Sequence, residues 1–170
     1  MNNPNRIVTY RILNGNEDMD LYRDLITDKV MDIIVNNESS LPLFRHANRE
    51  SVYSYLHIAF TNESTIKIIG MFNERNELVA GCLITVDSPW YNDSFLFIEE
   101  CVTISFVNGT GATGVVADAL EHYANEWGAD CILMSNANPN ARKMISNTMH
   151  KKNWDSYETF YKMMWLVINK

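Results

Sequence analysis

A glycine-rich stretch between two segments of different periodicity constrains this chain more than any other feature. It reads Asn108-Gly-Thr-Gly-Ala-Thr-Gly114. The preceding run, Phe95–Val107, is rich in β-branched and aromatic residues, whereas apolar side chains recur at helical spacing from Val115 to Trp127. Such a strand-to-helix turn leaves amide N–H groups unpaired at the positive end of a helix dipole, which favours a phosphate or pyrophosphate. The sequence therefore predicts a phosphorylated cofactor.

Two nucleotide-binding motifs can be compared with this stretch. Residues Gly109–Gly114 fit the dinucleotide fingerprint G-x-G-x-x-G, and Asp130 follows at about the distance of its ribose-binding acid. However, Asp130 opens the next predicted strand instead of closing it, and the motif falls late, whereas the doubly wound fold begins with this unit. A P-loop is excluded because no Gly-Lys-Ser/Thr follows. The dinucleotide interpretation is therefore disfavoured.

The segment Asn108–Thr113 resembles the R/Q-x-x-G-x-G/A pyrophosphate loop of the GNAT superfamily, the acetyl-CoA-dependent N-acetyltransferases. The predicted elements that follow resemble the C-terminal half of this family in their order: helix Gly114–Trp127, strand Asp130–Ser135, helix Pro139–His150 and closing strands. The segment Asn153–Tyr161 is similar to the last turn and strands of small, phage-type members.

Upstream, the pattern predicts elements in the order that this family uses: a strand at Arg6–Leu13, helices to about Val35 and over Arg49–Phe60, and strands at Thr65–Phe72 and Leu78–Asp87. The resemblance thus implies an α/β (α+β) fold, with a mixed, mostly antiparallel central sheet flanked by helices. Its order is strand-helix-helix-strand-strand-strand-helix-strand-helix-strand-strand. No linker or repeat interrupts residues 1–170, so we expect a single GNAT-like domain.

The resemblance implies that acetyl-CoA is the cofactor. It assigns the pyrophosphate to the loop, and the pantetheine arm to backbone groups near the end of the preceding strand. The implied cofactor-binding residues are Thr103, Ile104, Ser105, Asn108, Gly109, Thr110, Gly111, Ala112 and Thr113, with Asn138 and Asn140 competing for one further contact.

Two residues depart from the family pattern. Asn108 stands where the loop usually has Arg or Gln, and it is shorter and uncharged. Met149 stands where many members carry a Tyr that protonates the departing thiolate, so the acid would be elsewhere, and the adjacent His150 is a candidate.

Acetyl transfer to an amine needs a neutral nucleophile and a polarised carbonyl. Strict alternation would put Glu99, Cys101 and Thr103 on one face of the strand and Glu100, Val102 and Ile104 on the other. Family members often carry an acid at the place of Glu99, so we expect Glu99 to be the base, directly or through a water. A solvated or salt-bridged Glu99 is the competing interpretation. Cys101 could be a nucleophile or an inert buried thiol.

Composition restricts the partners and the location. The net charge of −7 argues against non-specific nucleic-acid binding and suits an amine or basic acceptor. Three cysteines in apolar runs indicate reduced thiols, and no apolar run approaches a membrane span, so we expect a cytoplasmic protein. Cys and His spacing predicts no metal site. The basic residues near the C-terminal helix either meet CoA phosphates or are solvated: Arg142, Lys143, Lys151 and Lys152.

The leading prediction is an N-acetyltransferase that acts on a primary amine of a small molecule, a peptide N-terminus or a lysine. One alternative is a GNAT-fold binding or inhibitory protein without catalysis, which Asn108 and Met149 favour. Another is a phage-type DNA-modifying acyl transferase, which the negative charge disfavours. The acceptor pocket would be shaped by the loop Asn36–Asn48 and the following helix, where Phe44, His46 and Tyr53 are candidates. The closing strands could pair in a homodimer.

Overall fold

The computed structural model describes residues 3–37, 47–61, 65–134 and 142–152, and the chain divides into two compact units at Met134. The first unit contains β1 (Thr9–Leu13), α1 (Gly15–Asn37), α2 (Arg49–Ala59), β2 (Ile66–Phe72), β3 (Leu78–Asp87), β4 (Phe97–Ser105), α3 (Ala112–Trp127) and β5 (Cys131–Met134). The second contains α4 (Arg142–Lys151). The expected closing strands lie outside the described residues, and a single domain over the whole chain stays a prediction.

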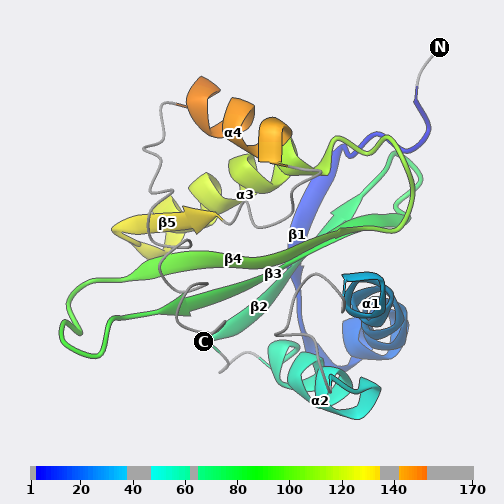
Figure 1. The fold of residues 1–170 in the computed structure, drawn as a ribbon, viewed down its shortest axis with the longest axis horizontal. Helices are drawn as coiled ribbons and strands as arrows, with labels where there is room; N and C mark the ends of the chain where they lie inside the picture. Colours follow the sequence, from blue (N-terminus) through cyan, green and yellow to red (C-terminus); the bar gives the residue numbers. More distant parts are fainter. Residues whose placement is uncertain (1–2, 38–46, 62–64, 135–141, 153–170) are drawn as a thin grey trace. The chain divides into compact units, whose positions relative to one another are not determined.

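The five strands of the first unit form one sheet in the order β1-β2-β3-β4-β5. The first three pairings are antiparallel, and only β4 and β5 are parallel. Because parallel neighbours need a crossover, α3 connects them across one face of the sheet, while α1 and α2 cover the other face (Figure 1). The predicted α/β fold with a mixed, mostly antiparallel sheet is confirmed.

The helix after the loop forms where the apolar periodicity predicts it. Along α3, Val116, Leu120 and Tyr123 are buried at helical spacing. Its C-terminus ends at Gly128, whose φ of 70° lets the next amide, that of Ala129, donate back to the Ala124 carbonyl at 2.8 Å. These buried side chains face the sheet, where α3 contacts β4 and β5. This packing holds the start of α3 at the end of β4.

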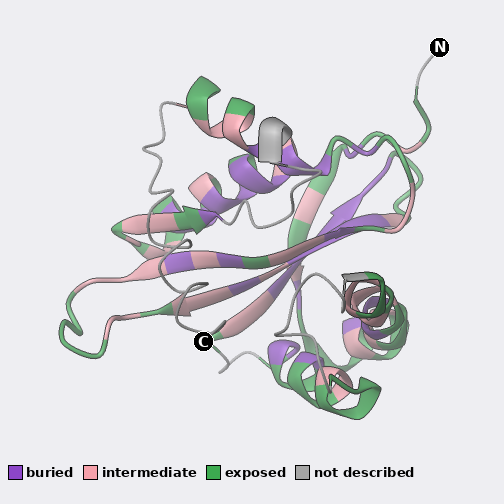
Figure 2. Ribbon diagram, in the orientation of Figure 1, coloured by how far each residue is buried: buried purple, intermediate pink, exposed green. Residues whose placement is uncertain are grey.

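The face of the sheet under α1 and α2 carries an apolar core, and Figure 2 marks buried residues on the central strands in purple. Side chains from both helices and from four strands meet there. The fully buried members are Leu13, Ile26, Leu56, Ala59, Phe60, Ile68, Phe72 and Ile104. Gly70 on β2 leaves the room that Leu13 fills, since a Cβ on Gly70 would lie 2.6 Å from Leu13 Cδ2.

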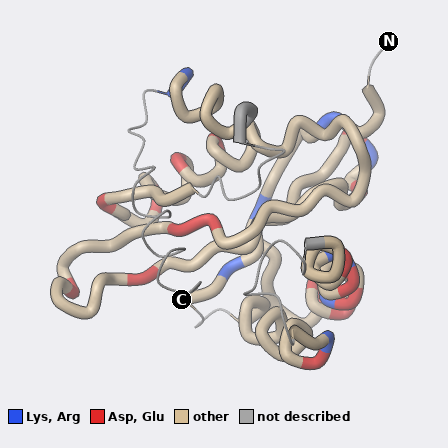
Figure 3. Tube along the Cα trace, in the orientation of Figure 1, with Lys and Arg blue, Asp and Glu red and all other residues tan. Residues whose placement is uncertain are grey.

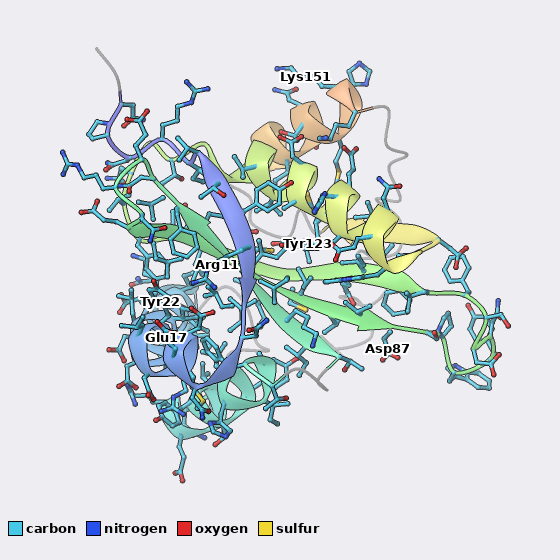
Figure 4. All side chains as sticks on the ribbon, turned by 180° about the vertical axis from the view of Figure 1, so that it is seen from behind. Arg11, Glu17, Tyr22, Asp87, Tyr123 and Lys151 are labelled. Carbon is cyan, nitrogen blue, oxygen red and sulfur yellow. The ribbon has the colours of Figure 1, made fainter. Side chains whose placement is uncertain are left out.

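An ion pair joins β1 to the start of α1, and Figure 4 labels its basic partner, Arg11, on β1. The guanidinium of Arg11 donates two hydrogen bonds of 2.6 Å to the Asp18 carboxylate, which also accepts from the Asn14 amide at 3.0 Å. Asp18 is buried, and its hydrogen bonds with Arg11 hold the pKa of its carboxyl below the usual value. The pair therefore ties the first strand to the helix that follows it.

We expect Gly70→Ala to destabilise the protein by about 1–3 kcal/mol, because the added methyl group overlaps the fully buried Leu13 side chain. Urea unfolding measures the loss. Gly81→Ala is the matched control, since Gly81 pairs with Gly70 across the two strands, and its Cβ would meet Ile104 at an ordinary 3.6 Å. Equal losses in the two variants would contradict this packing.

We expect Asp18→Asn to cost about 1.5–3 kcal/mol at neutral pH, the usual range for hydrogen bonds to a charged group. Because folding lowers the pKa of Asp18, its stabilisation is present above the unfolded pKa of about 4 and is lost as the pH falls through the folded pKa. The difference between wild type and variant should therefore shrink in urea unfolding below pH 4. Asp28→Asn, which breaks an exposed pair with Arg49, is the control and should have a smaller effect at pH 7. A difference for Asp18→Asn that does not change with pH would contradict the assignment.

Candidate functional site

The turn between β4 and α3 exposes a set of backbone amides. Gly109 and Gly111 adopt left-handed φ angles of 77° and 71°, which favour glycine. Gly111 is the N-cap of α3, and glycine has no side chain to accept from the first amides of the helix. Within the described residues, no hydrogen bond is recorded from the amides of Gly109, Thr110, Gly111 or Thr113. These N–H groups therefore stand at the positive end of the α3 dipole without an acceptor among the described residues.

Two hydroxyl groups at this turn form a hydrogen bond with each other. Ser105 and Thr110 share a hydrogen bond of 3.3 Å, and Thr110 Oγ1 accepts from the Ala112 amide at 3.3 Å. Thr110, Ala112 and Thr113 are buried. The hydroxyl groups of Ser105 and Thr110 are thus hydrogen-bonded within the protein. Most backbone amides of the turn, in contrast, have no acceptor among the described residues.

The turn has room for a ligand. A Cβ built on Gly111 or Gly114 would meet no atom of the described residues within 4 Å. Open space over unpaired amides suits a pyrophosphate, which takes several N–H donors and needs close backbone approach. The residues present therefore fit the phosphate end of CoA, although Asn108 offers no positive charge.

A β-bulge changes the faces of β4. The register with β3 pairs Glu100 with Ile84 and Val102 with Leu83, which leaves Cys101 as an extra residue. Thr103 consequently lies on the face of Glu100, and its hydroxyl donates to the Glu100 carboxylate at 2.9 Å. The predicted strict alternation is therefore wrong beyond Cys101, because an inserted residue reverses the period of two.

The apolar residues of β4 show the same reversal. Val102 and Ile104 pack in the core under α1 and α2, whereas strict alternation placed them on the Glu100 face. Leu83, opposite Val102 on β3, packs in the same core.

The two neighbours of β4 end at different points. Pairing with β5 runs from Phe97↔Cys131 to Glu100↔Met134, whereas pairing with β3 continues to Ser105. Within the described residues, positions 101–105 therefore have a strand on one edge only. In that part of the chain, the backbone groups on the other edge have no strand partner and could hydrogen-bond a ligand. This is the segment to which the family resemblance assigns the pantetheine arm.

Asp130 has a structural role at the opposite end of β4. Its carboxylate accepts from the Leu96 amide at 2.9 Å, and its own amide donates to the Leu96 carbonyl at 2.7 Å. These bonds join the starts of β4 and β5. The acid that a dinucleotide site would need is thus bound to the backbone, far along the strand from the glycine turn.

Glu99 lies on the α2 side of the sheet, half-buried and paired with Thr85. The same environment includes Tyr55 of α2. Burial raises the pKa of the Tyr55 hydroxyl, and the nearby Cys101 and Glu99 raise it further. Tyr55 is therefore a neighbour of the candidate base that the sequence did not single out.

Tyr53, two residues earlier on the same helix, is from the sequence only one candidate for lining the acceptor pocket. The Tyr53 ring packs under the Arg23 guanidinium at 4.1 Å from the ring centroid, between α1 and α2. No local signal distinguishes the two tyrosines. The other pocket candidates, Phe44 and His46, lie outside the described residues.

Cys101 is exposed and not buried as the inert-thiol interpretation supposed, but its raised pKa disfavours the reactive thiolate. Desolvation raises its pKa to about 11, and the carboxylates of Glu99 and Glu100 act in the same direction. The thiolate that a nucleophile requires is therefore scarce at neutral pH. This disfavours the covalent alternative.

The remaining candidates can be placed only in part. His150 is exposed in α4 of the second unit, together with Lys151. Asn138 and Asn140 lie outside the described residues. In the first unit, His57 contacts Arg23 at 2.9 Å.

The described part of the chain has neither a cluster of metal ligands nor a helix that could span a membrane. It contains no group of three His, Cys, Asp or Glu side chains arranged to hold a metal ion. None of its helices is long and apolar enough to cross a membrane.

Solved structures share this fold. A possible acetyltransferase from Clostridium difficile 630 superposes with a TM-score of 0.63 at 10% identity, covering 84% of this chain and 89% of the other. A predicted acetyltransferase from Clostridium acetobutylicum, solved with acetyl-CoA, gives 0.58 at 15% identity, covering 89% and 92%. An aminoglycoside acetyltransferase from an uncultured soil metagenomic sample, in complex with sisomicin, gives 0.54 at 12% identity, covering 82% and 86%.

The class that these structures define is the GNAT-type acetyltransferase fold, and this chain has that fold. The resemblance inferred from residues 108–113 is thereby confirmed at the level of the fold. No family model and no curated protein sequence matches the chain.

Proposed function

We propose that this protein is an N-acetyltransferase that uses acetyl-CoA and a primary amine. The observation that carries the proposal is the left-handed turn at Gly109 and Gly111, with its unpaired amides at the start of α3, in a fold shared with solved acetyltransferases. One of those structures is described with acetyl-CoA. Bound acetyl-CoA would supply an activated acetyl thioester, and the chain would supply binding and proton transfer.

The loop Asn108–Thr113 would bind the pyrophosphate through its amides. The free edge of β4 at Thr103, Ile104 and Ser105 would hydrogen-bond the pantetheine arm, since that edge lacks a strand partner among the described residues. Asn138 and Asn140 stay predictions for a further contact.

Glu99 would accept the proton of the attacking amine, directly or through a water. Its place on the α2 side of the sheet, beside Tyr55 and Cys101, supports this role because it puts a carboxylate next to the bulged part of β4. His150 stays a prediction for the acid that protonates the departing thiolate.

The acceptor that we favour is a cationic amine. The chain carries a net charge of −7, and acidic residues recur along α1 (Figure 3). A field of this sign attracts cations toward the surface and repels polyanions. The structural neighbour solved with sisomicin is an aminoglycoside acetyltransferase, but the acceptor class of this chain, a homodimer and a cytoplasmic location stay predictions.

The second candidate is a protein that binds the cofactor without catalysis. Asn108 favours it, because its uncharged side chain gives the pyrophosphate less than Arg would. Turnover separates the two candidates: CoA release with any amine of a broad library supports the enzyme, and binding of acetyl-CoA without turnover supports the alternative.

We expect Gly111→Ala to weaken CoA binding at least about tenfold, because a side chain in the left-handed region costs roughly 1–2 kcal/mol and reorients the amides. Isothermal titration calorimetry measures the affinity. Gly128→Ala is the matched control, with nearly the same φ of 70° at the other end of α3 and also no neighbour of its Cβ among the described residues. The free energy of unfolding should fall by similar amounts in both variants, but only Gly111→Ala should lose affinity for CoA. Equal affinities in both would argue against a phosphate site at this turn.

We expect Glu99→Gln to lower kcat by about 10²–10⁴, the range for loss of a general base, with CoA affinity unchanged. Glu100→Gln is the comparison, because it lies next along the strand, faces the α3 side and keeps an oxygen for Thr103. The main effect of Glu100→Gln should be on the free energy of unfolding and not on kcat. Unchanged turnover in Glu99→Gln would show that the base is another group.

A further inference from the structure

A segment before β1 contacts the glycine turn from a position about a hundred residues away in sequence. The Asn3 side-chain amide donates to the Gly109 carbonyl at 2.7 Å, and that of Asn5 donates to the Asn108 carbonyl at 3.2 Å. Two successive carbonyls of the turn are thus bound by two asparagines. No motif in the sequence connects these regions.

The direction of these bonds has a consequence for the turn. In a planar trans peptide the C=O and the N–H point in opposite directions. The Asn108 carbonyl shares its peptide with the Gly109 amide, and the Gly109 carbonyl shares its peptide with the Thr110 amide. Binding both carbonyls toward the segment therefore directs both amides away from it. Neither amide has a recorded acceptor among the described residues.

The segment is itself fixed to the sheet. The Asn3 side-chain oxygen accepts from the Asn5 amide at 3.0 Å, and the Asn3 carbonyl accepts from Arg6 at 3.1 Å. Its Pro4 carbonyl accepts from the side chain of Asn73, which is buried in the turn after β2. Asn3 and Asn5 are therefore held in place independently of the glycine turn.

Gly109 fits this contact closely. A Cβ on Gly109 would lie 3.4 Å from the side-chain nitrogen of Asn3, so a larger residue would press on the hydrogen bond. Glycine at this position thus permits both the left-handed φ and the approach of Asn3.

We propose that Asn3 and Asn5 form an asparagine clamp that pre-orients the amides of Gly109 and Thr110 toward the pyrophosphate of CoA. The inference rests on the proposed function and adds positioning residues to it. Pre-organisation raises affinity by lowering the ordering cost of binding. The clamp would thereby offset part of what Asn108 lacks in charge.

The test compares Asn3→Ala, Asn5→Ala and the double variant with wild type. Calorimetry with CoA and steady-state kinetics with acetyl-CoA and acetyl-pantetheine, which lacks the pyrophosphate, give the readouts. We expect the double variant to bind CoA at least about tenfold more weakly. KM for acetyl-CoA should rise with kcat unchanged, and kcat/KM for acetyl-pantetheine should not change.

Asn125→Ala is the matched control, because its side chain also donates to a backbone carbonyl, that of Glu121 at 2.8 Å, near the far end of α3. Asn125→Ala should leave CoA affinity and the kinetics with both acetyl-CoA and acetyl-pantetheine unchanged. Equal losses for acetyl-CoA and acetyl-pantetheine in the double variant, or a lower melting temperature with unchanged CoA affinity, would reduce the clamp to a structural contact and overturn the proposal.

Backbone ¹⁵N relaxation of Gly109 and Thr110 without ligand separates the clamp from the proposed function. Lower order parameters in the double variant, together with no CoA binding by wild type, would keep the clamp as a device that orders the turn and refute the cofactor. CoA binding by wild type with unchanged order parameters and affinity in the double variant would keep the cofactor and refute the clamp.

Discussion

The pairing of β4 with two unlike neighbours determines the rest of the site. Its antiparallel bonds to β3 continue to Ser105, whereas its parallel bonds to β5 extend, within the described residues, to Glu100. The bulge at Cys101 lies where the second partner ends, and bulges increase local twist and bend the strand. A strand with one edge free for several residues is otherwise a liability. Here the free edge leads directly into the glycine turn.

The turn recognises its ligand through backbone groups in the mechanism that we propose. Amides at a helix N-terminus bind phosphate whatever side chains surround them, provided that glycine allows the left-handed geometry. Such a site tolerates extensive sequence change. This agrees with a fold shared with acetyltransferases at only 10–15% identity and with an Asn where the family usually has Arg or Gln.

The two faces of the sheet give the two glutamates of β4 different surroundings. The α3 side buries Glu100 against Thr103, beside the buried thiol of Cys82. The α2 side holds Glu99 near Tyr55, where both residues remain partly exposed. Adjacent glutamates thus have different environments, and the half-buried one is the better candidate to exchange a proton with a substrate.

The sequence by itself determined the order of the described elements, because hydrophobic periodicity and glycine act locally, while the closing strands stay a prediction. The run from Val115 to Trp127 specified α3, and Gly109 and Gly111 specified a turn with unpaired amides. Asp130 at the start of a strand was likewise readable from the pattern of its neighbours.

Only the tertiary structure decided which residues meet. The bulge at Cys101 reversed the faces of Thr103 and Val102, since one inserted residue shifts a period of two and leaves no local mark. The position of Tyr55 near Glu99 and that of Tyr53 against Arg23 depend on how α2 packs. The contacts of Asn3 and Asn5 with the turn join residues more than a hundred positions apart. Such contacts result from strand pairing and helix packing across the whole unit, and these are set by the fold and not by nearest neighbours in sequence.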